Sequence, residues 1–197
     1  MAADKRKDIA RDLARRYGTL TPAELDHLTA IITPVKLMRG QLAVQYGDIC
    51  RNIYYVQRGL VRQVYVKNGK ECTEHISYEG GIVMCIESLF NETPSTLAVE
   101  ALEPTTLYAI PYKEYMELAQ VTFNFCSILL AILEESLIVS QHKADTLRFE
   151  SARERYTRTL IDHPDIIRRA PLHIVASYLQ MTPETLSRVR TIVSEDL

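Results

Sequence analysis

The sequence predicts an α+β fold in which helical segments flank a β-rich middle region. Between Gly40 and Gly81, glycines alternate with short stretches that are rich in β-branched residues and tyrosine. Short strands separated by such turns are typical of a sandwich, roll or barrel. Before Ile31 and after Lys113, apolar residues recur at helical spacing, so we expect helices on both sides of the β region.

Two short segments carry specific signals for these elements. Thr21-Pro22-Ala23-Glu24 combines an N-cap, a proline at the first helical position and an acid in the first turn, which predicts a helix start. Asn68-Gly69, between alternating segments, predicts a tight β-hairpin. The clearest strands are expected at Asn52–Val56 and Leu60–Val66, and two more are expected at Leu97–Ala101 and Thr106–Ile110.

The bulk composition excludes several classes of protein. The 197 residues are 47% hydrophobic and 24% charged, which is ordinary for a globular chain. A net charge of -2 argues against a protein that coats nucleic acid by charge alone, so any DNA contact has to come from a local basic patch. No uncharged apolar run reaches the roughly 20 residues of a membrane span, and no apolar core follows Lys5–Lys7. We therefore expect a cytoplasmic protein without a membrane partner.

Cysteine and histidine usage predicts no metal site or bound cofactor. Metal and iron–sulfur sites usually show a close cysteine pair, which is missing here, and the histidines are scattered. We expect free, mostly buried thiols. No Ser/His/Asp set or glycine-rich phosphate loop is present, so we do not expect an enzyme. The residues concerned are Cys50, Cys72, Cys85, Cys126, His27, His75, His142, His163 and His173.

A long helix is predicted to begin near Phe123. Its apolar residues recur at about 3.5-residue spacing, which indicates a coiled-coil seam. The alternative is a helix that packs only on the sheets of its own chain. Because the seam outlasts the expected extent of the sheets, we favour a homodimer that forms along this helix. The seam consists of Phe123, Leu130, Leu133, Leu137, Ser140, Ala144 and Leu147.

Residues 148–197 are predicted to form a small helical module. Its first helix spans Ser151–Ile161, and two further helices are expected at Pro171–Leu179 and 182–193. The turn between the last two is short, and the small residue Ala176 lies where two helices would cross closely. Two short helices with a tight turn and a polar outer face are typical of a helix-turn-helix.

The 182–193 helix carries the chemistry for reading DNA. Four of its polar residues recur at i, i+3, i+4 and i+7 and share one face. Arg188 could donate two bonds to guanine and Glu184 could accept one from cytosine, while Arg190 and Arg168-Arg169 could contact phosphates. Taken singly, Glu184 could merely complement the helix dipole and Arg188 could be a solvated charge. Together with the turn they favour DNA binding, by Thr182, Pro183, Glu184, Ser187, Arg188, Arg190 and Thr191.

Three stretches resemble the Crp/Fnr family of regulators. Arg39 to Gly59 resembles the family's glycine-spaced β-roll, Glu100–Leu107 resembles its closing strand pair, and Ala176–Arg188 resembles its helix-turn-helix, which is the most specific match. The resemblance covers nearly the whole chain. It implies a double-stranded β-roll, similar to a cyclic-nucleotide-binding jelly roll, followed by a long dimerisation helix and a C-terminal helix-turn-helix.

With this resemblance we expect three domains and three partners. The β-roll sensor domain with its N-terminal helix would span residues 1–112, the dimerisation helix 113–147 and the DNA-binding domain 148–197. The partners are double-stranded DNA, a second copy of the chain and, as a further candidate, RNA polymerase. Glu184 and Arg188 fall on the family's base-reading positions.

The segment expected to bind an effector departs from the family's pattern. Cyclic-nucleotide binders carry Gly-Glu, where the glutamate holds the ribose, and then an arginine that pairs with the phosphate. Here Cys85-Ile86 and Ser95 stand at those positions, and Glu87 is out of register by one residue, although shifted pairing could restore it. A cyclic phosphate in a closed pocket needs a paired positive charge or several amide donors, so we expect weak or no binding of cyclic AMP. The candidate effector-pocket residues are Cys85, Glu87, Ser88, Ser95 and Thr96.

Two smaller departures concern the DNA-binding module. Gln180 stands where the turn often carries glycine, and a non-glycine residue with a positive φ is uncommon but allowed. Little room is left between Pro164 and Pro171 for the β-wing that usually precedes the helix-turn-helix. We therefore expect a minimal module with few phosphate contacts.

Three functions remain open from the sequence. The favoured one is a dimeric DNA-binding transcriptional regulator whose effector is a small molecule other than cyclic AMP, or whose roll only couples to a partner. The second is a transcription factor that responds to a cyclic nucleotide. The third is a ligand-binding regulatory subunit that does not bind DNA.

Overall fold

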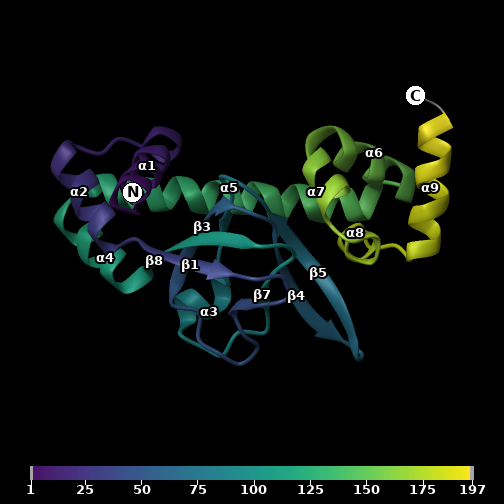
Figure 1. Ribbon diagram of the computed structural model, residues 1–197, viewed down its shortest axis with the longest axis horizontal. Helices are drawn as coiled ribbons and strands as arrows, with labels where there is room; N and C mark the ends of the chain where they lie inside the picture. The colour runs from purple at the N-terminus through teal and green to yellow at the C-terminus, as the bar shows by residue number, and fades with distance from the viewer. Residues whose placement is uncertain (1, 196–197) are drawn as a thin grey trace.

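The computed structural model describes residues 2–195 of the chain, and the side chains of residues 5–195. It confirms the α+β fold with helices on both sides of a β-roll. Helices α1 (Ala2–Tyr17) and α2 (Pro22–Ile31) precede the roll, and the long helix α5 (Phe123–Phe149) follows it. Figure 1 shows α5 lying across the roll, with the N-terminal helices near one of its ends and the C-terminal helices near the other.

The roll consists of two antiparallel four-stranded sheets. One sheet has the strand order β1-β8-β3-β6 and the other has the order β2-β7-β4-β5. The predicted hairpin joins β4 and β5, and its turn residues Asn68 and Gly69 both have a positive φ, of 52° and 73°. The strands are β1 (Thr33–Leu37), β2 (Leu42–Val44), β3 (Asn52–Arg58), β4 (Val61–Lys67), β5 (Lys70–Ser77), β6 (Ile82–Val83), β7 (Ala98–Ala101) and β8 (Thr105–Pro111).

Gly59 lies where the chain crosses from the first sheet to the second. Its φ of 107° is in the region that favours glycine. A Cβ at this position would lie only 2.3 Å from the Thr105 Oγ1 atom at the start of β8. The missing side chain therefore lets β3 end against β8 and lets β4 begin in the opposite sheet.

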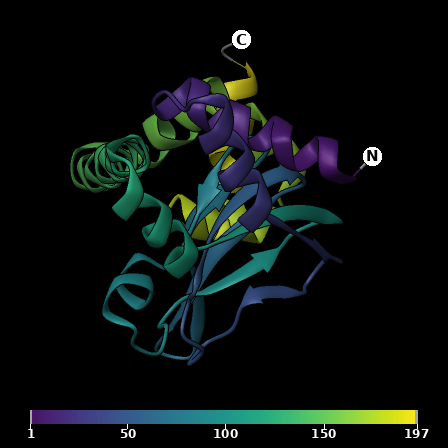
Figure 2. The same ribbon diagram turned by 90° about the vertical axis from the view of Figure 1, so that its left-hand side faces the viewer.

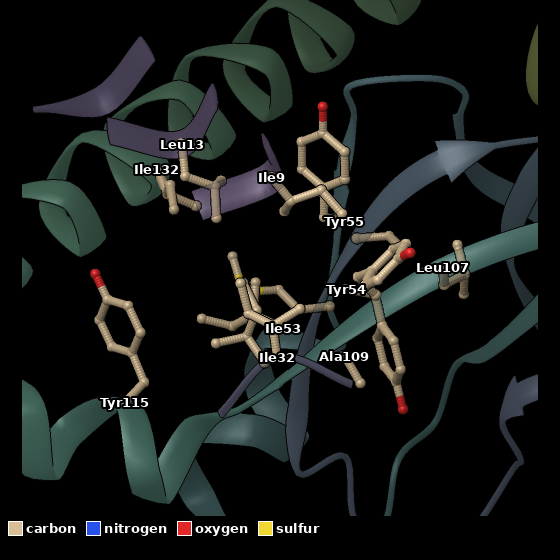
Figure 3. Close-up of a cluster of buried hydrophobic side chains, with 14 of the residues drawn as sticks. Ile9, Leu13, Ile32, Ile53, Tyr54, Tyr55, Leu107, Ala109, Tyr115 and Ile132 are labelled. Carbon is tan, nitrogen blue, oxygen red and sulfur yellow. The ribbon is translucent and has the colours of Figure 1, made fainter. Parts of the chain in front are cut away.

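The main core joins the roll to the helices on one side of it. Figure 3 shows Ile9 and Leu13 of α1 and Ile132 of α5 facing Ile53 of β3, with Leu107 of β8 further along the same sheet. Burial of each such side chain contributes about 1.5–3 kcal/mol. In Figure 2, where α5 is seen nearly end-on, the helix lies beside the sheets. The helix start predicted at Thr21 is confirmed, and it forms a capping box in which Glu24 N–H donates to Thr21 Oγ1 and Thr21 N–H donates to the Glu24 carboxylate.

Helix α5 begins at Phe123, as predicted, and runs without interruption to Phe149. The preceding residues, which were assigned with it to one segment, form a separate helix α4 (Tyr112–Val121). The seam residues Phe123, Leu130 and Leu137 are 78%, 56% and 70% exposed. By length and composition alone, α5 is also apolar enough to cross a membrane, with a mean hydropathy of 1.7 over 18 residues of which 22% are buried. Its outer face is thus an apolar surface that the single chain leaves uncovered.

The C-terminal helices form a second, smaller core. They are α6 (Ala152–Asp162), α7 (Pro164–Arg169), α8 (Leu172–Tyr178) and α9 (Pro183–Glu195). Leu60, Ile76 and Leu102 of the roll belong to the same cluster as the buried residues of these helices. Helix α7, which the sequence did not predict, occupies the segment in which little room was expected for a β-wing. The domain boundaries after residues 112 and 147 remain predictions.

Arg169 has a different role from the predicted phosphate contact. Its guanidinium forms ion pairs with Glu79 at 2.7 Å and Glu103 at 2.6 Å, both in the roll segment, and its side chain is only 18% exposed. Its charge is therefore committed to holding α7 against the roll. Arg168 beside it is 77% exposed and pairs with Asp165 within α7.

Candidate DNA interface and effector pocket

Helices α8 and α9 form the predicted helix-turn-helix. Ala176 is fully buried at the crossing, and its carbonyl accepts a hydrogen bond from Met181 N–H at 3.0 Å. Gln180 has a φ of 50°, so the turn adopts the left-handed conformation without a glycine, as expected from the sequence. This strained residue redirects the chain within a few positions and sets the angle at which α9 leaves α8.

Helix α9 is held by a capped start and an apolar inner stripe. Thr185 N–H donates to Thr182 Oγ1 at 3.2 Å, which satisfies one of the free donors of the first turn. Leu186, Val189 and Val193 are buried against the rest of the module. The position of α9 is therefore fixed by packing, and its other face is left to solvent.

All seven residues predicted to bind DNA are exposed in the single chain. Glu184, Ser187, Arg188 and Thr191 lie on the outer side of α9, at the far end of the molecule from α1 (Figure 1). Hydrogen bonds from its own backbone N–H and from the Thr182 hydroxyl lower the pKa of Glu184, so its carboxylate is charged at neutral pH. This face thus offers a carboxylate acceptor, two hydroxyls and a guanidinium donor.

Arg190 lies apart from these residues. It contributes to a cavity of about 30 Å³ that is also lined by Tyr156, Ile167 and Leu172. Its stem therefore lies towards α6, α7 and α8. A contact from Arg190 to a phosphate remains a prediction, and a role in reading bases is not favoured by this placement.

The effector-pocket residues divide between the interior and the surface of the roll. Cys85 is the N-cap of the short helix α3 (Ile86–Asn91), and Cys85, Ser88 and Ser95 are buried. Glu87 and Thr96 are exposed. The structure therefore brings Cys85, Ser88 and Ser95 together and does not bring Glu87 into the interior, where shifted pairing would have placed it.

The buried serines are already satisfied by the protein. Ser88 Oγ accepts from Cys50 N–H at 2.9 Å and donates to the Thr93 carbonyl at 2.6 Å. Ser95 Oγ donates to the Leu97 carbonyl at 2.7 Å and accepts from its N–H at 3.2 Å. The hydroxyls of both serines are thus hydrogen-bonded within the protein rather than free for a ligand.

Arg62, the last arginine before this segment in the sequence, is buried and committed elsewhere. Its guanidinium pairs with Glu100 at 2.6 Å and also with Glu71. Both carboxylates balance its charge, so Arg62 would have to break these pairs to hold a phosphate. Arg62 is therefore not a ready substitute for the phosphate-binding arginine in whose place Ser95 stands.

A second cavity was not predicted from the sequence. It has a volume of about 330 Å³ and lies where β5, α5, α6 and α8 meet. His75, Lys143, Arg155 and Tyr178 contribute to its wall. Burial and the neighbouring Lys143 charge lower the pKa of His75 to about 4, so this imidazole is neutral at pH 7. Because the lining residues come from four elements that are distant in the sequence, no motif could have indicated the site.

Comparison with known proteins supports the family resemblance. Residues 34–121 match the cyclic nucleotide-binding domain. Similar solved structures include FixK2 from Bradyrhizobium japonicum (18% identity, TM-score 0.73, 84% of this chain and 86% of that one). Catabolite activator protein from Thermus thermophilus is 25% identical, with a TM-score of 0.57 over 94% of this chain and 87% of that one. CLP from Xanthomonas campestris, a c-di-GMP responsive global regulator, is 19% identical, with a TM-score of 0.70 over 89% and 93%.

No curated protein matches the chain. The roll, the long helix and the C-terminal helices nevertheless follow one another here as they do in these solved structures, over most of each chain. The resemblance inferred from the three sequence stretches is therefore confirmed. The chain carries a cyclic nucleotide-binding domain within the architecture of the Crp/Fnr family of regulators.

Proposed function

We propose that the chain is a dimeric, sequence-specific transcriptional regulator of the cytoplasm that reads DNA with α9. The observation that carries this proposal is the outer face of α9, where Glu184, Ser187, Arg188 and Thr191 are all exposed on a packed and capped helix. Such a helix can enter the major groove, and its side chains match the donors and acceptors of base edges. A regulator of this kind needs no catalytic residues, and RNA polymerase is its candidate partner at a promoter.

The uncovered face of α5 supports a homodimer. Leu130 and Leu137 are more than half exposed, and Ile138 beside them is 55% exposed. A second copy of α5 would cover these residues in a coiled-coil seam. Two recognition helices about 34 Å apart could then read two half-sites of one operator.

The bound effector is proposed to be a small molecule other than cyclic AMP. Support comes from the exposed Glu87 and from the internal hydrogen bonds of Ser88 and Ser95. A phosphate would have to displace these bonds without an arginine in place of Ser95. The match of residues 34–121 to the cyclic nucleotide-binding domain favours the second candidate, a regulator that responds to a cyclic nucleotide.

Contacts between the roll and α8 provide a route for coupling. Thr73 N–H in β5 donates to Ser177 Oγ in α8 at 2.8 Å. Lys143 of α5 pairs with Glu74 of β5 at 2.9 Å. A shift of β5 would therefore be transmitted both to α5 and to the helix-turn-helix. An effector has to bind one of the two arrangements more tightly to produce such a shift.

DNA binding is tested with purified full-length protein and genomic fragments around its own gene, at fixed salt. After the operator is mapped, Arg188→Ala is expected to weaken operator binding about ten- to hundredfold, because one bidentate base contact is worth about 1–3 kcal/mol. Discrimination at one base pair should relax as well. Arg11→Ala, which removes an equal charge from the exposed surface of α1, is the control and should leave the affinity unchanged.

The same titration with cyclic AMP separates the candidate functions. Selective binding that ignores cyclic AMP supports the proposed regulator. Binding that requires cyclic AMP supports the second candidate. Selective binding that survives the double variant Glu184→Ala, Arg188→Ala contradicts α9 as the reading helix, and the absence of any selective binding favours a regulatory subunit that acts on a protein.

A further inference from the structure

The cavity of about 330 Å³ beside β5 lies where the roll, the long helix and the C-terminal helices meet. Its wall takes residues from β5, α5, α6 and α8, at the end of α5 that lies near the C-terminal helices (Figure 1). Small-molecule sites in proteins are concave, have volumes of about 300–1,000 Å³ and often lie between structural units. The cavity therefore has the size and the position of a ligand site, and the chemistry of its wall decides which ligand it accepts.

Arg155 of α6 brings a positive charge into this wall without a carboxylate beside it. Its Nε–H donates to the Leu179 backbone carbonyl at 2.9 Å, and its Nη1 donates to the Glu150 backbone carbonyl at 2.6 Å. Both acceptors are uncharged, and no carboxylate among residues 5–195 forms an ion pair with Arg155. A guanidinium has five N–H donors, so three of them remain for a ligand. Because charges that are partly removed from water are usually paired, this guanidinium favours an anion from solution.

The other charged groups of the wall determine how many negative charges the ligand carries. Lys143 and Arg158 already have carboxylate partners. Asp162 also lines the cavity, but it is exposed to water and lies seven residues, about 10 Å along the helix, beyond Arg155. One positive charge near Arg155 therefore lacks a partner. It matches a ligand with a single negative charge, whereas a doubly charged phosphate ester would bring one charge too many.

The rest of the wall fits an apolar body with one or two polar groups. Val139, Leu147 and Leu179 contribute aliphatic surface to the cavity. Tyr178 contributes an aromatic ring, and neither its hydroxyl nor the His75 ring forms a hydrogen bond with any residue in the described part of the chain. The neutral His75 ring can both donate and accept. A ligand can therefore bond to these two groups without displacing a partner.

We propose that this cavity binds a small organic monocarboxylate, whose carboxylate pairs with Arg155 and whose apolar body lies against Val139 and Tyr178. The two carboxylate oxygens accept N–H bonds from the free side of the guanidinium, a bidentate arrangement that adds strength and direction. The bonds from Arg155 to the backbone stay in place, whereas a ligand of the roll would have to replace the bonds of Ser88 and Ser95. This inference does not rest on DNA binding, because occupancy of the cavity is measured without an operator.

The test titrates the full-length protein with phenylacetate and with hexanoate, and the dissociation constants are measured from two-dimensional NMR spectra. Phenylacetamide, which replaces the carboxylate by a neutral amide of similar shape, is the matched control. It should bind at least about tenfold more weakly than phenylacetate, because a hydrogen bond to a charged group is worth more than one tenfold step in affinity. Cyclic AMP also carries one negative charge, so stronger displacement of phenylacetate by cyclic AMP than by hexanoate would overturn the assignment to a carboxylate. The absence of binding of both carboxylates at millimolar concentration would overturn it as well.

Two variants assign the binding to this cavity. Arg155→Gln removes the charge and should weaken phenylacetate binding at least about tenfold, while the affinity for phenylacetamide changes little. Val139→Phe fills part of the cavity from α5 and should weaken the binding of both compounds. It decides the question even if Arg155→Gln loosens the fold, because Val139 is 42% exposed and the bonds of Arg155 stay intact.

Val66→Phe adds the same volume to an exposed residue of β4 outside the cavity and is the control for Val139→Phe, because Val66 is 56% exposed. It should bind phenylacetate as the native chain does. Unchanged phenylacetate affinity in the Val139→Phe protein, or equal affinities of the native chain for phenylacetate and phenylacetamide, would overturn the proposal.

Discussion

The outer face of α9 and the interior of the roll around α3 were both predicted to bind a partner, but their polar groups are in opposite states. Glu184 and Arg188 on α9 are exposed, as an interface for an external partner requires. Ser88 and Ser95 in the roll are buried, and each already donates and accepts hydrogen bonds within the protein. The face of α9 is therefore accessible to a partner, whereas the polar groups of the roll around α3 are already hydrogen-bonded within the protein.

This difference has an energetic consequence. A partner of α9 gains bonds to groups that are in contact with water, whereas a ligand of the roll has to replace bonds that the fold already makes. Leaving one buried polar group unpaired costs about 1–3 kcal/mol. An effector for the roll therefore has to provide equivalent hydrogen bonds, or the signal has to enter elsewhere, such as the cavity of about 330 Å³ beside β5.

The largest expected effect concerns the uncovered face of α5. A dimer formed through this face would place two copies of α9 on one operator. Leu137→Glu places a charge on this apolar face, where Leu137 is 70% exposed. We expect a monomer by sedimentation velocity and a loss of operator affinity of at least a hundredfold, because joining two binding sites raises avidity by about 10²–10⁴.

Gln141→Glu adds the same charge to an exposed residue of α5 outside the seam and is the matched control. It should remain dimeric and bind DNA as the native chain does. A Leu137→Glu protein that stays dimeric would show that the chains associate through another surface.

How far the sequence predicts this molecule depends on whether the signal is local. Helix starts at Thr21 and Thr182 and the hairpin at Asn68-Gly69 were predicted correctly, because caps and turns are determined by neighbouring residues. Helices α3 and α7 were missed. Each has only six residues, too few to show a helical period, and no side chain caps the start of either, so Pro164 and Asp165 at the start of α7 were not recognised as a helix start.

Contacts between distant segments were the other limit of the sequence. The exposed face of α9 follows from helical spacing alone. In contrast, the burial of Cys85 at the start of α3 depends on the pairing of β6 with β3, and the diversion of Arg169 depends on two carboxylates of the roll. The burial of Ser88 and the exposure of Glu87 likewise depend on α3, which was not predicted. Sequence reasoning thus named residues of both sites but could not tell which were accessible.

A smaller effect is expected from removing one of the buried serine hydroxyls of the roll. Ser88 is 2% exposed, and its hydroxyl bonds to both Cys50 N–H and the Thr93 carbonyl. Ser88→Ala removes this shared partner from both groups. We expect the free energy of unfolding in urea to fall by about 1–3 kcal/mol. Operator affinity of the folded dimer should not change, because both bonds of Ser88 are made within the roll.

Ser194→Ala removes an exposed hydroxyl that donates to the Thr191 carbonyl within α9 and should cost less than about 0.5 kcal/mol. Equal free energies of unfolding for the Ser88 and Ser194 variants would contradict the view that the hydrogen bonds of the buried serine stabilise the roll.

The smallest effect concerns the ion pair that links Arg169 of α7 to the roll. Glu79 N-terminal to β6 accepts from Arg169 of α7 and from Gly59 N–H, and the bonds from Arg169 are the main reason that the pKa of Glu79 falls to about 2. In the unfolded chain its pKa is about 4.3. A carboxylate with a lowered pKa stabilises the folded state above the unfolded value, and this contribution is lost as the pH falls from about 5 towards 2.

Arg169→Ala should therefore lower the free energy of unfolding at pH 7 and flatten its decline between about pH 5 and pH 2. Because the Glu79 side chain is 42% exposed, solvent screens the pair, and we expect a loss below about 1 kcal/mol at pH 7. Arg168→Ala is the matched control, since Arg168 is 77% exposed and pairs with Asp165 one turn away in the same helix. Urea unfolding at a series of pH values measures both variants. If the Arg169 and Arg168 variants decline in parallel with the native protein, the Arg169 pairs do not couple the roll to the C-terminal helices, and the apolar contacts of Leu60, Ile76 and Leu102 and the hydrogen bond from Thr73 to Ser177 remain as the links between them.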